Sequence, residues 1–333
     1  MSSLLVLLNP SANRVYAGQV AAISAAELAA LTGTDVRQVT VAGVPYLELD
    51  ASADAPALAR CSGRLAVFRR EGELLRPVAV PDTDLFDDDL VTIPKYPGKT
   101  NEQFTRLMMN LTLAAAERQG PLTVLDPLCG RGTTLLTAWT LGHNAAGVDA
   151  DGKALHTLAD YLRSYLRRKR ISHRVSMDPV RREGRSLGRK LDASATVNGT
   201  ELSLTAYPGD ARTSADLFGR KTFDAIVTDA PYGVVHGSRR AGGTQSGGAA
   251  QGQAPRARSA AALLADALPI WARQLRSGGA IGIAWNTYSL PRSELAELAR
   301  NAGLTPVQSE PYLAVAHRVD SAIHRDLLVA RKP

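Results

Sequence analysis

The stretch TVLDPLCGRGTTLLTAWTLGHNAAGVD, residues 123–149, decides the fold of this chain. An apolar strand ends on Asp126, and a tight turn containing Gly130 and Gly132 follows. The next residues have the apolar spacing of a helix, and a second apolar strand ends on Asp149. A strand, a glycine turn, a helix and a strand that ends on an acid form the layout of a nucleoside-binding crevice.

The sequence of the turn distinguishes between two kinds of nucleoside cofactor. A dinucleotide fold uses the spacing G-x-G-x-x-G, but Leu135 stands where the third glycine belongs. The stretch instead reads D-x-x-x-G-x-G, so that the carboxylate of Asp126 can face a sulfonium or an amino group. Asp149 can accept both hydroxyl protons of a ribose. The pattern therefore favours S-adenosylmethionine over NAD, with an ordinary glycine turn in an α/β domain as the alternative.

A second signal lies downstream, where the buried-strand sequence FDAIVTD ends on Asp229 and is followed by Ala230, Pro231 and Tyr232. The two stretches resemble the amino-methylating branch of S-adenosylmethionine-dependent methyltransferases. More narrowly, DPLCGRGTTL and TDAPYG are similar to the tRNA guanine-N2 methyltransferases of the Trm11 and Trm-G10 type. The sequence departs from that family at Ala230, where proline is usual. A strand-ending turn without a catalytic role is the alternative.

The resemblance implies a fold and a set of catalytic residues. The expected fold is α/β, a Rossmann-like sheet of seven mostly parallel strands with one antiparallel edge, behind a small N-terminal α+β domain. The expected catalytic residues are Asp229, Ala230, Pro231 and Tyr232. The Asp229 carboxylate and the Ala230 carbonyl would accept the hydrogens of an exocyclic amino group, and Tyr232 would stack on the base.

The cofactor contacts are expected around the glycine turn, at the ends of the neighbouring strands and in a segment before the turn. An N-cap role competes for Asp210, and a capped helix start competes for the segment that begins at Lys99. The predicted cofactor-binding residues are Lys99, Phe104, Thr105, Asp126, Leu128, Cys129, Gly130, Gly132, Thr133, Asp149, Ala150, Asp210 and Ala211. No metal site is expected.

Three segments are expected along the chain. Residues 1–85 read as an N-terminal α+β domain that weakly resembles a ferredoxin-like unit, with a packing role as the alternative. Residues 86–105 read as a linker and cofactor-covering segment, and residues 106–333 as the methyltransferase domain. The Trm-G10 type enzymes carry an RNA-binding THUMP domain, for which there is no room before Val91.

Two irregular stretches are expected inside the methyltransferase domain. Residues 167–200 read as a basic, partly mobile insertion, and residues 234–259 as a flexible loop over the target base. Residues 151–200 hold twelve Lys/Arg and five Asp/Glu, a balance of +7 that equals the net charge of the whole chain. Such a concentration of positive charge predicts a polyanionic partner, most simply nucleic acid. A solvated loop is the alternative.

Together these features predict transfer of a methyl group from S-adenosylmethionine to a base amino nitrogen, with guanine N2 of tRNA first. DNA adenine-N6 or cytosine-N4 is the second choice, and ribosomal RNA and protein glutamine are further substrates to test. A non-catalytic cofactor-binding or RNA-binding module and an NAD-linked oxidoreductase are hypotheses from different functional classes. A small activator protein is a conceivable partner. No apolar run reaches the length of a membrane span, and a cytoplasmic location is expected.

Overall fold

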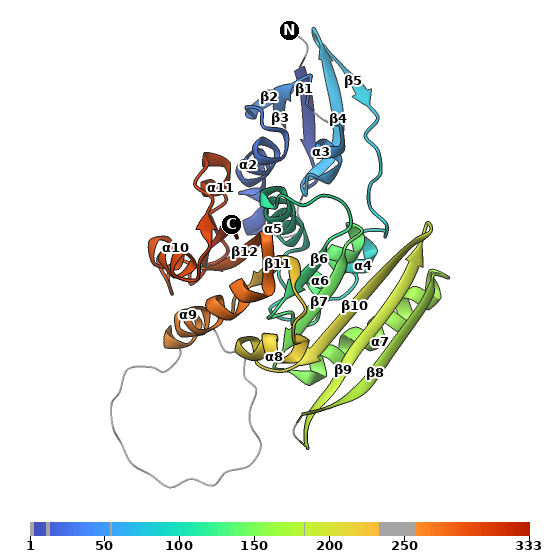
Figure 1. Cartoon of the computed structure of the whole chain (residues 1–333). Helices are drawn as coiled ribbons and strands as arrows, with labels where there is room; N and C mark the ends of the chain where they lie inside the picture. Colours follow the sequence, from blue (N-terminus) through green and yellow to red (C-terminus); the bar gives the residue numbers. More distant parts are fainter. Residues whose placement is uncertain (1–2, 11–13, 54, 183, 233–256) are drawn as a thin grey trace.

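The computed structural model describes residues 3–10, 14–53, 55–182, 184–232 and 257–333. It arranges them in two β-sheets with helices around them (Figure 1). For residues 14, 15, 182, 185 and 257–259 it describes the backbone alone.

The smaller sheet is built from the N-terminal residues. Its strands are β1 (Ser3–Leu8), β2 (Arg37–Val41), β3 (Val44–Asp50), β4 (Arg64–Glu71) and β5 (Leu74–Val78). They lie in the order β2-β3-β1-β4-β5, and all neighbours are antiparallel. Three helices interrupt them: α1 (Arg14–Ala17), α2 (Val20–Thr32) and α3 (Ala55–Arg60). The first four strands with α2 and α3 follow the chain order of a β-α-β-β-α-β unit of the ferredoxin-like kind.

The larger sheet has ten strands. They are β6 (Thr123–Asp126), β7 (Asn144–Asp149), β8 (Ser172–Arg182), β9 (Arg185–Val197), β10 (Thr200–Pro208), β11 (Phe223–Asp229), β12 (Leu275–Asn286), β13 (Thr305–Pro306), β14 (His317–Arg318) and β15 (His324–Arg331). Their order is β13-β15-β12-β11-β6-β7-β10-β9-β8, with β14 beside β15. Strands β10, β7, β6, β11 and β12 run parallel. The predicted Rossmann-like sheet is therefore confirmed.

The sheet differs from the prediction in two ways. The reversed strand β15 was expected at an edge, but it lies between β12 and β13 and is antiparallel to both. In addition, β8, β9 and β14 extend the sheet beyond the seven expected strands. A C-terminal strand that returns antiparallel to β12 covers an edge that would otherwise expose unpaired backbone groups.

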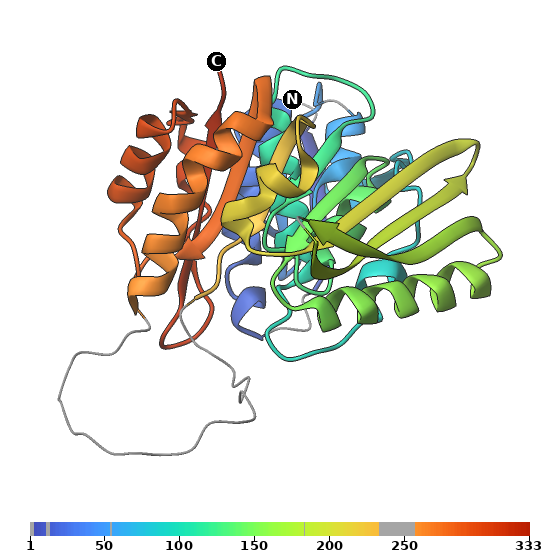
Figure 2. The ribbon, with the colours of Figure 1, turned by 60° about the horizontal axis from the view of Figure 1, so that its bottom comes forward.

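Helices cover both faces of the larger sheet, because alternate side chains of each strand point to opposite faces. On one face pack α5 (Glu102–Ala115), α6 (Thr133–Thr140) and α7 (Gly152–Arg168). On the other pack α9 (Ala257–Gln274) and α10 (Arg292–Asn301), with α8 (Ser214–Phe218) beside them. Figure 2 shows α7, in green, running along the strands β8 to β10.

The basic insertion predicted at residues 167–200 is not an irregular loop. Its first residues end α7, and the rest forms the long antiparallel strands β8 and β9. Three alternate residues in the second half of β9, namely Leu191, Ala193 and Ala195, are buried in the core that contains α7. Two of these three residues are alanine, so the period-two pattern is faint in the sequence.

A two-residue turn joins β9 to β10. Asn198 and Gly199 both have positive φ, 49° and 79°, and Val197 pairs with Thr200 across the turn. An Asn-Gly pair between strands is a strong hairpin signal, since both residues tolerate the left-handed region. The Asn-Gly pair is visible in the sequence and predicts this hairpin. The composition of the segment does not indicate it.

The short helix α11 (Glu310–Leu313) follows β13 and has a proline in its first turn. One further segment differs from expectation. The segment expected as a linker, residues 86–105, contains α4 (Asp89–Thr92) and the start of α5.

The N-terminal unit packs directly on α5. Val20, Ile23 and Ala26 of α2 belong to the same buried core as the apolar face of α5. Beside them, the fully buried carboxylate of Glu27 accepts hydrogen bonds from the Ser62 backbone N–H and from the Asn110 side chain at 2.7 Å. A buried carboxylate needs such partners, so this contact fixes α2 to α5.

Candidate active site

The candidate site lies where the strand order of the larger sheet changes direction. From β6 the chain proceeds through β7 and β10 toward one edge, and β11 returns to the other side of β6. Asp126, Asp149 and Asp229 end β6, β7 and β11. Because these strands are parallel, their carboxyl ends meet at one edge of the sheet, where α/β folds bind ligands.

The glycine turn has the backbone that the sequence predicts. Gly130 and Gly132 have φ values of 51° and 87°, which a residue with a Cβ rarely adopts. A Cβ on Gly132 would lie 2.6 Å from the Leu158 side chain, and one on Gly147 would lie 2.8 Å from Cys129 Sγ. The turn therefore packs too closely against its neighbours for larger residues.

Asp126 ties the turn to the next strand. Its Oδ1 accepts hydrogen bonds from the Leu128 backbone N–H at 3.0 Å and from the Thr228 hydroxyl at 2.7 Å. The carboxyl group is 2% exposed, and burial raises its pKa to about 7. A cation beside this group would favour its charged form, which is the environment that a sulfonium or an ammonium group supplies.

Asp149 closes the other side of the turn. Its Oδ2 accepts from the Gly130 N–H at 2.7 Å, and its Oδ1 accepts from the Asp151 N–H at 2.8 Å. Desolvation raises its pKa. Each carboxylate oxygen can accept a second hydrogen bond, so Asp149 is held in place and can still bind two hydroxyl groups.

The other residues predicted around the turn occupy different positions. Cys129 is buried, and its backbone N–H donates to the Val148 carbonyl at 2.9 Å. Leu128 is partly buried against the core below α9, and Ala150 is exposed. Thr133 begins α6, and its hydroxyl bonds to the hydroxyl of Tyr96 at 2.7 Å.

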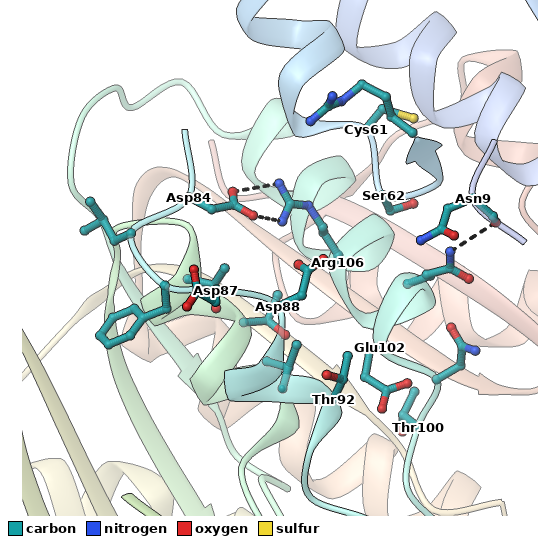
Figure 3. A pocket seen from close by; sticks show the side chains of 18 of the residues that line it. Asn9, Cys61, Ser62, Asp84, Asp87, Asp88, Thr92, Thr100, Glu102 and Arg106 are labelled. Atoms are coloured by element: carbon teal, nitrogen blue, oxygen red, sulfur yellow. Dashed lines mark hydrogen bonds and ion pairs between the residues drawn. The ribbon is translucent and has the colours of Figure 1, made fainter. Parts of the chain in front are cut away.

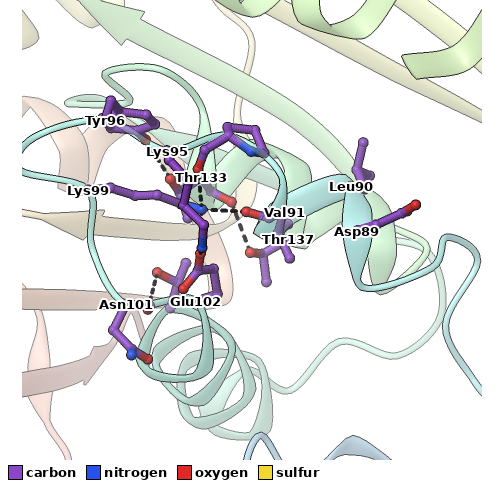
Figure 4. Close-up of polar contacts among 12 residues, drawn as sticks. Asp89, Leu90, Val91, Lys95, Tyr96, Lys99, Asn101, Glu102, Thr133 and Thr137 are labelled. Carbon is purple, nitrogen blue, oxygen red and sulfur yellow. Dashed lines mark hydrogen bonds and ion pairs between the residues drawn. The ribbon is translucent and has the colours of Figure 1, made fainter. Parts of the chain in front are cut away.

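The segment before the turn is organised differently from the prediction (Figure 4). Lys99 directs its ammonium group to the carbonyls of Val91 and Pro94 and to the carboxylate of Glu102. These contacts hold residues 91–102 together. They also occupy the Lys99 ammonium group, which was expected to reach the cofactor. The N-cap of α5 is Asn101, whose side chain accepts from a backbone N–H of the first turn.

Phe104 and Thr105 are buried in α5. Phe104 has no exposed surface, with the His317 ring at 4.9 Å and the Arg325 guanidinium 4.7 Å from its centroid. The Thr105 hydroxyl donates to the Asn101 carbonyl at 3.1 Å. These contacts are structural, and the cofactor role of both residues stays a prediction. Tyr96, which the prediction omitted, lies closer to the turn, with the Arg131 guanidinium 4.9 Å from its ring.

Asp210 and Ala211 follow β10. Asp210 caps the short helix η1 (Ala211–Thr213) by accepting from the Arg212 N–H at 2.8 Å. The Arg212 guanidinium also donates to both of its carboxylate oxygens and lowers its pKa. The N-cap alternative therefore describes this structure, and the adenine-binding role of Asp210 stays a prediction. Ala211 is buried, and its carbonyl accepts from Trp271 Nε1 at 3.0 Å.

The catalytic turn begins at Asp229. The Ala230 N–H donates to the Ala284 carbonyl of β12 at 2.8 Å, and Ala230 is 1% exposed. This bond fixes the direction of the turn although proline is missing at Ala230. Pro231 is exposed, and the Tyr232 hydroxyl donates to Asp229 Oδ1.

Two residues that sequence reasoning missed complete the turn. The Thr100 hydroxyl donates to Asp229 Oδ2, and the Arg325 guanidinium lies 3.9 Å from the same oxygen. Arg325 Nε also donates to the Tyr232 hydroxyl at 2.6 Å. Neither residue belongs to a local motif, and the fold alone brings both to Asp229.

A wide cleft of about 1540 Å³ lies between the N-terminal unit and the segment before α5 (Figure 3). Asn9 and Ser62 line one side, and Asp84 and Arg106, which form an ion pair, lie on the other. The cleft reaches Thr100. The acids of the glycine turn are not among its described lining residues, so the cleft adjoins the catalytic turn without containing the cofactor site.

One prediction falls outside the described residues. It concerns the flexible loop at residues 234–259, of which the structure describes only the backbone of residues 257–259. Within the described ranges, no three His, Cys, Asp or Glu side chains are grouped as metal ligands would be. In the same ranges, no helix has the length and apolar character that a membrane crossing requires.

Comparisons with known proteins agree with this geometry. Residues 93–245 match the family model described as UPF0020: RMKL-like, methyltransferase domain. A curated relative, the tRNA (guanine(10)-N2)-dimethyltransferase of Methanothermobacter thermautotrophicus, is 26% identical over 176 residues. That match covers 48% of this chain and 40% of the relative.

Solved structures with similar folds include TrmN from Thermus thermophilus, at 16% identity and a TM-score of 0.42. That match covers 90% of this chain and 60% of the TrmN chain. The magnesium protoporphyrin IX methyltransferase from Synechocystis PCC 6803 matches at 10% identity and a TM-score of 0.41, covering 72% of this chain and 87% of that chain. The family match spans both the glycine turn and the predicted catalytic turn, so the chain is similar to this family over residues 93–245.

Proposed function

We propose that this protein transfers a methyl group from S-adenosylmethionine to an exocyclic amino nitrogen of a nucleic-acid base, with guanine N2 in tRNA as the substrate. The family match and the curated relative, which acts on guanine N2 of tRNA, support this choice. The observation that carries it is the bridge from Asp126 through the Thr228 hydroxyl to β11, because it sets the glycine turn directly beside Asp229.

The residues around the glycine turn suit the cofactor. Asp149 would hold the ribose hydroxyls, and the glycines allow backbone to approach the ligand. Asp126, a buried carboxyl group whose pKa is about 7, would be favoured in its charged form by a nearby cation. S-adenosylmethionine supplies a methyl group on a positively charged sulfur that is a good leaving group.

The chain's own contribution is to prepare the target amine. The lone pair of a base amino group is delocalised into the ring, so the amine is a poor nucleophile. Asp229 and the Ala230 carbonyl would accept its two hydrogens and turn its lone pair outward. Most of the rate then comes from positioning and from electrostatic stabilisation. As the new nitrogen–carbon bond forms, Asp229 is placed to take the proton that the nitrogen must lose.

A basic surface beside the methyltransferase sheet supports a nucleic-acid partner. The end of α7 and the start of β8 expose four arginines: Arg167, Arg168, Arg170 and Arg174. Lys169, between them, contacts Asp87 and Asp89 and is neutralised. These four exposed arginines would contact phosphates, so this arginine surface is the proposed RNA contact.

The parts of the chain outside residues 93–245 are assigned from their packing. We place the boundary of an N-terminal domain near residue 85 and infer that the domain, held to α5 by Glu27, helps to hold the RNA. A small activator protein could supply further RNA contacts. Since the cofactor is made in the cytoplasm, we expect the protein to act there.

The proposed function is tested by tritium transfer from labelled S-adenosylmethionine into bulk tRNA, ribosomal RNA, genomic DNA and protein. The expected result is label in tRNA that disappears with the Asp229→Ala variant. Label in DNA alone, or in protein alone, would contradict the substrate. Absence of label from every pool, despite binding of S-adenosylmethionine by calorimetry, would contradict the proposed catalysis under these conditions.

A further inference from the structure

The hydroxyl of Tyr232 lies between two groups of opposite charge. It donates to Asp229 Oδ1 and accepts from Arg325 Nε at 2.6 Å. Burial, followed by the nearby charge of Asp229, raises the pKa of Tyr232 well above its usual range. The hydroxyl therefore stays protonated at neutral pH and remains a donor to the carboxylate.

Arg325 is fixed in this arrangement. It is 5% exposed on β15, and its guanidinium lies 4.7 Å from the ring centroid of Phe104 and 5.0 Å from that of Tyr232. A buried cation requires nearby negative charge or acceptors. Asp229 supplies the charge at 3.9 Å and the tyrosine hydroxyl supplies an acceptor. Arg325 is thus a rigid support for the hydroxyl of Tyr232.

Both oxygens of Asp229 already accept a hydrogen bond. Tyr232 donates to Oδ1, and Thr100 donates to Oδ2. An amino group that needs a carboxylate acceptor must share or take one of these positions. Thr100 lies in the segment that Lys99 holds to Val91 and Glu102, whereas Tyr232 follows Asp229 by three residues in the same turn and carries the ring that is expected to meet the base. The tyrosine hydroxyl is the contact that can be exchanged.

We propose that the Tyr232 hydroxyl occupies the position of the target amino group on Asp229, and that Arg325 is the positioning residue that holds it there. Binding of the base moves the hydroxyl off Oδ1, and an amino N–H takes its place. The ring of Tyr232 is then released to stack on the base. This inference rests on the proposed function, because it assumes a base with an exocyclic amine.

Removing the hydroxyl tests the exchange. Tyr232→Phe keeps the ring but removes the competing donor, so the Kd for tRNA should fall by roughly threefold to tenfold, the range that the net free energy of one ordinary hydrogen bond allows. Tyr232→Ala removes the stacking ring as well and should raise the Kd. Arg325→Gln should lower the Kd in the same direction as Tyr232→Phe. The Kd is measured by equilibrium binding with S-adenosylhomocysteine, so that no transfer occurs.

The matched control is Tyr46→Phe, which removes a tyrosine hydroxyl from β3 in the smaller sheet and should leave the Kd unchanged. An unchanged or higher Kd for Tyr232→Phe would overturn the exchange. A second readout needs no substrate: the ¹⁹F resonance of 3-fluorotyrosine at position 232 should move when Arg325→Gln is introduced. An unmoved resonance would overturn the Arg325 contact, whereas failure of the proposed function would appear separately, as absence of methyl transfer by the unaltered protein.

Discussion

The two halves of the site are built from different kinds of contact. In the cofactor half, the bond from the Gly130 backbone to Asp149 joins residues 19 apart in the chain. In the base half, Asp229 accepts from Thr100, which is 129 residues away, and the Tyr232 hydroxyl accepts from Arg325, which is 93 residues away. The glycine turn of the first half is a local motif, with one distant contact from Thr228 to Asp126, whereas Thr100 and Arg325 reach the second half only after the whole sheet has formed.

This difference predicts separable functions. The proposed cofactor half is held by the glycine turn and by two adjacent parallel strands, with one hydrogen bond from Thr228 of β11 to Asp126, so we expect cofactor binding not to depend on Asp229 or Tyr232. The base half depends on β11, β15 and the segment before α5, and it acts on the substrate. Variants in one half should therefore spare the other, and each half can be tested by its own substitutions.

The largest effect is expected for Asp229→Ala. The rate of methyl transfer should fall by about 10²–10³-fold, the usual cost of removing one preorganised group that acts on the reacting centre. The Kd for S-adenosylmethionine should change little, because Asp126 and Asp149 remain. Single-turnover tritium transfer measures the rate and calorimetry measures the Kd. Asp229→Asn, which keeps an acceptor oxygen, should be less severe. Loss of S-adenosylmethionine binding in Asp229→Ala would show that the two halves of the site are not separable.

The next effect concerns the other half. Asp149→Ala removes a charged acceptor for the ribose and for the Gly130 N–H, so the Kd for S-adenosylmethionine should rise by roughly 10- to 100-fold. The Kd for tRNA should stay within about twofold, since the basic surface is intact. Asp149→Asn is the matched control, because it preserves size and one acceptor. A normal cofactor Kd in Asp149→Ala would show that the ribose binds elsewhere.

A smaller effect concerns stability against pH. The carboxyl group of Asp126 has an ordinary pKa of 3.8 when exposed, and burial raises the folded-state value to about 7. Between these values the folded protein binds more protons than the unfolded protein, so this group lowers stability as pH rises from about 4 to about 7. Above pH 7 the loss is complete.

Asp126→Asn should therefore flatten that part of the pH profile of unfolding. The free energy of unfolding is measured by urea titration at pH 5, 6, 7 and 8, without cofactor. The amide retains an acceptor oxygen for Leu128 and Thr228, which limits other effects. If the free energy of unfolding changed with pH in the same way for both proteins, the proton would bind to a group other than Asp126.

The smallest effects are expected on the arginine surface. Arg167→Ala and Arg170→Ala should each weaken tRNA binding modestly and lower the slope of log K against log salt by about 1, as for a lost phosphate contact. The rate at saturating tRNA should not change. Arg300→Ala, an exposed arginine of α10, is the matched control. If the slope of log K against log salt were equal for all variants and the unaltered protein, the arginine surface would not bind RNA.

The comparison of the two halves also shows how far the sequence predicts this structure. Asp126, Gly130, Gly132 and Asp149 carry a local pattern, and the structure brings them together at the expected edge of the sheet. Asp229 was found for a similar reason, because it ends a buried strand and lies just before a proline-containing turn.

The remaining features depend on long-range contacts or on weak patterns. Arg325 lies in a strand that reads as ordinary core, and nothing in its neighbourhood points to Asp229. Strand β9 buries two alanines in place of large apolar residues, so charge conceals its alternation. Lys99 is expected from the sequence to bind the cofactor, and this stays a prediction; in the structure its ammonium group contacts residues of its own loop.

The most direct measurement is mass spectrometry of the nucleosides obtained from tRNA after incubation with S-adenosylmethionine and the protein. The account predicts N2-methylguanosine with the unaltered protein and none with Asp229→Ala. N6-methyladenosine, or N2-methylguanosine formed equally by Asp229→Ala, would contradict the assignment of the catalytic turn.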